Sequence, residues 1–179
     1  MARPAPRRIR LAVDALDLRP DARVLEVGCG TGVAAALLCA RVPEGHVTAL
    51  DRSATAVGHA ERRLARWLDA GVADVAERDL VAFHGDGRPY DAVLAINVTL
   101  FWTAPAGAPD AAGAAATAVA RLDELLADDG AAHLWFEAPP GADAAEAGER
   151  ARAALAAGGL HAEATLVEGL AHVVGRRAG

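Results

Sequence analysis

Short apolar runs alternate with longer stretches of helical periodicity along most of the chain. Residues 24–27 form a short and largely apolar run, as expected of a parallel strand that is buried on both faces. Residues 9–18 instead repeat apolar side chains at helical spacing, and Ser53 is a typical helix N-cap. Strands are predicted over residues 24–27, 46–50, 72–76, 90–98 and 133–137, and helices over residues 9–18, 33–41, 53–70, 112–126 and 142–157.

The chain closes on two strand-like runs, residues 161–167 and 170–175, with only Glu168 and Gly169 between them. So short a connection predicts an antiparallel hairpin, since a parallel return needs a crossover of about a dozen residues or more. A second turn is predicted at Asp128-Asp129-Gly130, before the strand at residues 133–137.

The alternation of strands and helices up to residue 157 predicts the fold class. It is typical of a mainly parallel sheet with helices on both faces, a Rossmann-like three-layer α/β/α sandwich. No linker or repeat divides the chain. We therefore expect one domain over residues 1–179, with about residues 1–8 as a flexible N-terminal arm.

The strand 24–27 leads into a glycine-rich segment, Gly28-Cys29-Gly30-Thr31-Gly32. Glycine permits a positive φ and lets a ligand approach the backbone closely, and the helix that follows presents free N–H groups at its N-terminus. Ligands of open α/β sheets bind at this carboxyl edge. The alternative is a tight strand-to-helix turn that binds nothing.

Other polar residues also follow predicted strands. Asp51 lies about twenty residues after the glycines, where its carboxylate can accept hydrogen bonds from both hydroxyls of a ribose. It could instead cap the helix beside Ser53. Asp79 can accept from an adenine amine, with Leu80 packed near the ring, or it can be an ordinary surface-loop aspartate. Asn97 ends the strand that begins at Tyr90.

Glu26 discriminates between ligand classes. Its carboxylate lies two residues before Gly28, where it would repel a diphosphate and attract a positively charged amine. The spacing GxGxG also differs from the GxGxxG dinucleotide fingerprint and from the GK[ST] ending of a Walker A loop. A cationic nucleoside therefore fits better than NAD or ATP.

Taken together, VLEVGCGTG, HVTALD and YDAVLAINVTLFW resemble the class I S-adenosylmethionine-dependent methyltransferases of the bacterial, small-molecule type. The resemblance extends over about residues 9–176 and includes the closing hairpin. It implies a seven-stranded sheet of order 3-2-1-4-5-7-6 with the last strand antiparallel. It also implies S-adenosylmethionine as the cofactor and an enzyme that transfers methyl groups.

The resemblance also implies roles for single residues. Glu26 and the loop Gly28, Cys29, Gly30, Thr31 and Gly32 would hold the methionine portion, and Asp51 the ribose. Arg52, beside Asp51, is also counted as cofactor-binding. Asp79 and Leu80 would hold the adenine, although Asp74, Glu77 and Asp86 are open alternatives for the acidic position. Asn97 is similar to a residue that lines the transfer site.

Composition narrows the partners. The formal net charge is −6, which disfavours nucleic acid as a partner. Two cysteines ten residues apart form no metal-ligand pattern, so no metal site is expected. Asp14 and Asp17 interrupt the only apolar stretch near the N-terminus, so we expect neither a signal peptide nor membrane attachment, and a cytoplasmic protein, monomeric or homodimeric.

The acceptor side is less defined. Phe101 and Trp102 follow Asn97 and are candidates for an apolar acceptor pocket, or for core packing at the sheet edge. No catalytic residue is assigned, and His84 is a weak candidate for a general base. The favoured function is methyl transfer to a small molecule. The alternatives are a cofactor-binding scaffold of the same fold without transferase activity and an NAD-dependent enzyme.

Overall fold

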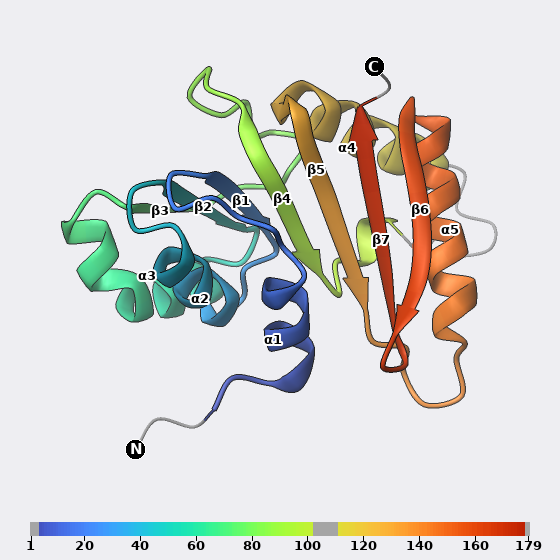
Figure 1. Cartoon of the computed structure of the whole chain (residues 1–179), viewed down its shortest axis with the longest axis horizontal. Coiled ribbons are helices and arrows are strands. Elements are labelled where there is room, and N and C mark those ends of the chain that lie inside the picture. Colours follow the sequence, from blue (N-terminus) through green and yellow to red (C-terminus); the bar gives the residue numbers. More distant parts are fainter. Residues whose placement is uncertain (1–3, 102–110, 178–179) are drawn as a thin grey trace.

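The computed structural model describes residues 4–101 and 111–177, which form one seven-stranded sheet with helices on both faces (Figure 1). The strand order β3-β2-β1-β4-β5-β7-β6 confirms the expected fold class. The strands are β1 (Arg23–Val27), β2 (His46–Asp51), β3 (Ala73–Glu77), β4 (Tyr90–Ile96), β5 (Leu126–Phe136), β6 (Leu160–Val167) and β7 (Leu170–Arg177). The helices are α1 (Arg7–Asp14), α2 (Val33–Arg41), α3 (Ala54–Asp69), α4 (Ala111–Leu125) and α5 (Ala144–Ala157), with a 3-10 turn η1 (Thr99–Phe101) after β4.

β1 lies at the centre of the parallel part of the sheet. Val24 pairs with Val47 of β2 on one side and with Ala92 of β4 on the other. All five residues of β1 are buried, which explains its short apolar pattern. β7 lies between β5 and β6 and is antiparallel to both, so the closing pair is the hairpin that the sequence predicts.

Alternate residues of the strands face two separate cores. Val24 packs with Val13 of α1 and Leu38 of α2, so α1, α2 and α3 cover one face. Leu25 belongs to the second core, where Leu122 of α4 and Leu155 of α5 cover the other face. Both cores therefore share the single sheet.

Two boundaries differ from the expected ones at the N-terminus. α1 begins at Arg7, so the last two residues of the expected arm are helical, and it ends at Asp14 rather than near Leu18. Pro20 lies six residues beyond this end, too far for the restrictions of a proline and of the residue before it to account for it. Leu16 nevertheless remains buried in the α1–α3 core.

The turn expected at residues 128–130 is a bulge inside β5. The pairing with β4 jumps from Tyr90–Leu126 to Ala92–Ala131, so the intervening residues of β5 arch away from the ladder. A Cβ on Gly130 would lie 2.8 Å from the Tyr90 carbonyl oxygen, so only glycine fits at this point.

The connection between β3 and β4 contains no helix, and all of its residues are described. Where a helix would otherwise cover the sheet, Leu80 of this connection packs into the core. Asp86 accepts two hydrogen bonds from the Arg23 guanidinium at 2.9 and 3.0 Å, and the buried Tyr90 hydroxyl donates to Thr48 Oγ1 at 3.0 Å. These contacts fix the residues that follow β3 at the edge of the sheet.

Candidate cofactor site

The glycine loop joins β1 to α2 at the carboxyl edge of the sheet. Gly28, Gly30 and Gly32 have φ values of 72°, 53° and 73°, a region that side chains other than glycine rarely adopt. Gly32 is the N-cap of α2, and a Cβ there would lie 3.0 Å from Ala60 of α3. A Cβ on Gly28 would lie 2.8 Å from Val98, whereas a Cβ on Gly30 would meet nothing within 4 Å. The loop is therefore tight at both ends and open at Gly30.

Asp51 ties this loop to the end of β2. Its Oδ2 accepts a hydrogen bond from the Gly30 N–H at 2.9 Å, and its Oδ1 accepts from the Ser53 N–H at 2.9 Å. The hydroxyl of Ser53, not Asp51, caps α3 by accepting from Ala56. Because a carboxylate has about four acceptor positions, Asp51 can still accept further hydrogen bonds from a ligand.

A pocket of about 380 Å³ opens beside Asp51, between the ends of β1, β2, β3 and β4. This volume lies within the range of small-molecule sites. Six residues expected from the sequence line it: Gly28, Asp51, Arg52, Asp79, Leu80 and Asn97. The other lining residues are Val27, Arg78, Ile96, Val98, Thr99 and Leu100.

Asp79 rather than the other acidic candidates lines the pocket. Its Oδ1 accepts from the Val81 N–H at 2.9 Å, which fixes the turn after β3. Asp74 pairs with His46 at 2.9 Å and Asp86 pairs with Arg23, so both lie toward the opposite end of the strands. Glu77 ends β3 without lining the pocket.

Asn97 is held in an uncommon conformation. Its φ is 57°, one of two positive values among the described non-glycine residues. Its side-chain Oδ1 accepts from the Glu137 N–H at 2.8 Å, and its own N–H donates to the Trp135 carbonyl at 2.8 Å. Asn97 thus joins the ends of β4 and β5 at the rim of the pocket.

Glu26 lies behind the loop and does not line the pocket. It is 4% exposed, and its Oε2 is a buried oxygen with no hydrogen-bond partner in the described part of the chain. Burial raises the pKa of this carboxyl to about 8; a hydrogen bond from the Ala35 backbone opposes the rise, and the nearby Asp51 adds to it. An unpaired buried carboxyl favours its neutral form until a cation approaches.

The remaining expected residues fall outside the pocket. Cys29 is buried and its N–H donates to Leu50, while burial and then the charges of Glu26 and Asp51 raise its thiol pKa to about 12. Gly30, Thr31, Gly32 and the exposed His84 do not line the pocket either, although the Gly30 N–H donates to Asp51. Phe101 is 3% exposed within the core, which matches the core-packing alternative, and Trp102 lies outside the described residues.

Some residues that line the pocket were not predicted from the sequence. Arg78 directly precedes Asp79 and carried a usable signal, because any residue at the end of β3 belongs to this edge. Thr99 and Leu100 reach the pocket through η1, and no pattern in the sequence indicates that turn.

Residues 4–101 and 111–177 contain neither a cluster of three or more potential metal ligands nor a helix long and apolar enough to cross a membrane.

Comparison with known proteins places these features in a family context. A family model described as a methyltransferase domain matches residues 25–132. The protein-L-isoaspartate O-methyltransferase of Pyrococcus horikoshii is 34% identical over 140 residues, which cover 74% of this chain and 56% of that relative. The chain therefore spans little more than half the length of this curated relative.

Solved structures show the same architecture at lower identity. A precorrin-6y C5,15-methyltransferase from Geobacter metallireducens superposes with a TM-score of 0.67 at 17% identity, covering 95% of this chain and 87% of that one. Human N-acetylserotonin methyltransferase, in complex with S-adenosylmethionine, superposes with a TM-score of 0.70 at 13% identity, covering 97% of this chain and 52% of that one. These likenesses concern the fold alone.

Proposed function

The chain belongs to the S-adenosylmethionine-dependent methyltransferase domain family, and from this premise we propose that it transfers a methyl group from that cofactor to a small-molecule acceptor. The observation that carries the proposal is the pocket at the carboxyl edge, where the glycine loop, Asp51 and Leu80 meet. The opposing charges Asp51 and Arg52 lie side by side in its wall.

The residues of this edge support the cofactor. Gly30 leaves open space above the loop for a ligand, and Asp51 has acceptor positions left for ribose hydroxyls. Leu80 offers an apolar surface for a base. The unpaired oxygen of Glu26 can supply negative charge near the loop once a cation approaches, which suits a cationic ligand rather than a diphosphate.

When bound, S-adenosylmethionine supplies a methyl group activated by its positively charged sulfur. The chain itself needs to orient the acceptor and to exclude water, because the transfer is an in-line displacement. Val98 and Leu100 provide apolar surface for that purpose beside Asn97. His84 stays exposed and apart from the pocket, so we assign no general base.

A second acceptor class follows from the relative in Pyrococcus horikoshii. Its name specifies an isoaspartyl carboxylate in proteins as the acceptor. A small molecule remains our proposal because the chain is acidic overall, with a net charge of −6, which disfavours nucleic acid as the acceptor. Both classes can be offered to the protein in one assay.

The first test is ligand-dependent stability. S-adenosylmethionine and S-adenosylhomocysteine should raise the melting temperature, whereas NAD⁺ should not, because binding to the folded state alone stabilises it. Asp51→Asn should weaken S-adenosylhomocysteine by about 1–3 kcal/mol, which calorimetry would detect as a loss of roughly 5- to 150-fold. Asp69→Asn, at the exposed end of α3, is the matched control. An equal response to NAD⁺ would overturn the cofactor assignment.

The second test separates an enzyme from a scaffold. Labelled methyl transfer would be measured across a panel of small hydroxyl, amine, thiol and carboxylate acceptors together with an isoaspartyl peptide. Transfer to a small acceptor supports the proposal, and transfer to the peptide alone replaces it with the second class. Tight cofactor binding with no transfer to any acceptor would favour the scaffold.

A further inference from the structure

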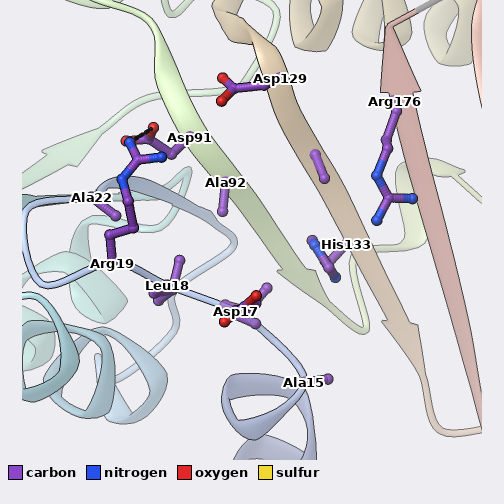
Figure 2. Close-up of a pocket in the computed structure, with 12 residues that line it drawn as sticks. Ala15, Asp17, Leu18, Arg19, Ala22, Asp91, Ala92, Asp129, His133 and Arg176 are labelled. Atoms are coloured by element: carbon purple, nitrogen blue, oxygen red, sulfur yellow. Dashed lines mark hydrogen bonds and ion pairs between the residues drawn. The ribbon is translucent and has the colours of Figure 1, made fainter.

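A second hollow, of about 220 Å³, lies away from the cofactor pocket (Figure 2). It is bounded by the α1–β1 connection, by Asp91 and Ala92 at the start of β4, and by parts of β5 and β7. The cofactor pocket contacts the same strand at Ile96 and then Asn97. Ile96 lies four residues along β4 from Ala92, which separates the two sites by roughly 13 Å.

Small side chains create this hollow. Ala22, Ala92 and Ala131 line it, and each is at most 8% exposed. Ala92 and Ala131 are direct partners across β4 and β5, so this one pair of positions presents only methyl groups to the hollow.

One charged pair in the wall is already satisfied. Arg19 donates to Asp91 at 2.8 Å, and the other oxygen of Asp91 accepts from the Arg23 N–H at 2.7 Å. These contacts hold the side chains of this wall in place, and both Arg19 and Asp91 have charge partners without a ligand.

Three further charged residues line the hollow without an ion pair in the described part of the chain: Asp17, Asp129 and Arg176. In Figure 2 the Arg176 side chain extends from β7 toward His133, while Asp129 and Asp17 lie on either side of that region. The Arg176 charge is felt at His133, because it helps to lower the pKa of that imidazole, after burial and His172. A lone cation and two lone carboxylates therefore surround one concave surface.

His133 adds a buried polar group. It is 9% exposed, and its Nδ1 shares a hydrogen bond with His172 Nε2 at 3.2 Å. Its other ring nitrogen has no hydrogen-bond partner among the described residues, although the residue lines the hollow. This nitrogen is therefore available for a hydrogen bond to a ligand in the hollow.

We propose that this hollow is a second binding site, for a small zwitterion of the α-amino acid class. The carboxylate of such a ligand pairs with Arg176 and His133, and its ammonium group pairs with Asp129 or Asp17. A simple anion would lie among the carboxylates of Asp17, Asp91 and Asp129. A simple cation would leave Arg176 unpaired, so a ligand with both charges matches best. The methyl groups of the floor leave room for a short side chain.

The test uses three probes of similar size and the full chain. L-alanine carries both charges, propionate lacks the ammonium group and ethylamine lacks the carboxylate. In two-dimensional amide NMR, L-alanine should shift resonances at residues 15–22 and 129–133 saturably, with a Kd on the order of 1 mM as befits so few ligand atoms. Propionate and ethylamine should each bind at least about tenfold more weakly.

Variants locate the site. Arg176→Gln and Asp129→Asn are changes at exposed positions, and each should weaken L-alanine at least about tenfold. Arg150→Gln, on the exposed face of α5, is the matched control and should change nothing. Absence of saturable shifts, shifts confined to residues 28–32 and 97, or equal binding of propionate would each overturn the proposal. None of these outcomes depends on methyl transfer, so the two proposals fail separately.

Discussion

At the scale of single residues, the buried carboxyl of Glu26 lowers the stability of the folded state when it ionises, and the same carboxylate is a candidate partner for a cationic ligand. The unfolded carboxyl loses its proton near its ordinary pKa of 4.5, whereas the folded one retains it to about 8. Between these values the folded state binds more protons, so stability falls as pH rises and levels off above about 8. The free-energy cost of burying the ionised carboxylate falls only when a cation lies close to its unpaired Oε2.

Glu26→Gln tests this directly. The amide is neutral at every pH and keeps an oxygen for the Ala35 N–H, so it should lack the loss of stability between pH 5 and 8. Urea unfolding should show the variant close to wild type at pH 5 and more stable at pH 8.5, by up to a few kcal/mol. A parallel pH dependence in both proteins would contradict the raised pKa.

Gly30 and Gly71 are matched positions for a Gly→Ala substitution. Both have a positive φ, 53° and 70°, and a Cβ on either meets nothing within 4 Å. Each Gly→Ala change should therefore cost about 1 kcal/mol of stability from backbone strain alone. Only Gly30→Ala should also weaken S-adenosylhomocysteine in calorimetry, because Gly71 follows α3 away from the pocket. Equal affinities of the two variants would remove Gly30 from the binding loop.

At the scale of elements, two helical glycines differ in what lies beside them. A Cβ on Gly58 of α3 meets nothing within 4 Å, whereas one on Gly148 of α5 would lie 3.1 Å from Ala171 of β7. Gly58→Ala should stabilise the protein by about 0.5–1 kcal/mol, the difference in helix propensity. Gly148→Ala should gain less or lose stability, because α5 must shift from the sheet. Chemical denaturation of both variants measures the contrast, and equal gains would contradict the close packing.

The elements also show how far the sequence leads. The short apolar runs and the two-residue connection at Glu168-Gly169 were enough to predict the strands and the final hairpin, and Gly28, Asp51 and Asp79 mark the carboxyl edge. The bulge in β5 was not predictable, since Asp128-Asp129-Gly130 has turn chemistry and only the pairing with β4 makes it part of a strand. The charge of Glu26 predicts a place at the ligand, and the structure shows this side chain buried beside the Ala35 backbone of α2, so its contact with a ligand stays a prediction.

At the scale of the whole molecule, one sheet separates two cores, and this determines how the protein unfolds. Leu94 faces the α1–α3 core and its neighbour Val93 faces the α4–α5 core, so neither side can lose its strand pairing alone. We therefore expect a single cooperative transition. Of the three tryptophans in the chain, Trp135 is 1% exposed in the α1–α3 core and Trp67 packs against that core, so the combined tryptophan fluorescence should report a midpoint equal to that of far-ultraviolet circular dichroism. S-adenosylhomocysteine should raise both midpoints equally, because its pocket is built from the ends of four strands of the shared sheet. Two separated transitions, or a ligand shift in one probe only, would show that the two sides unfold independently.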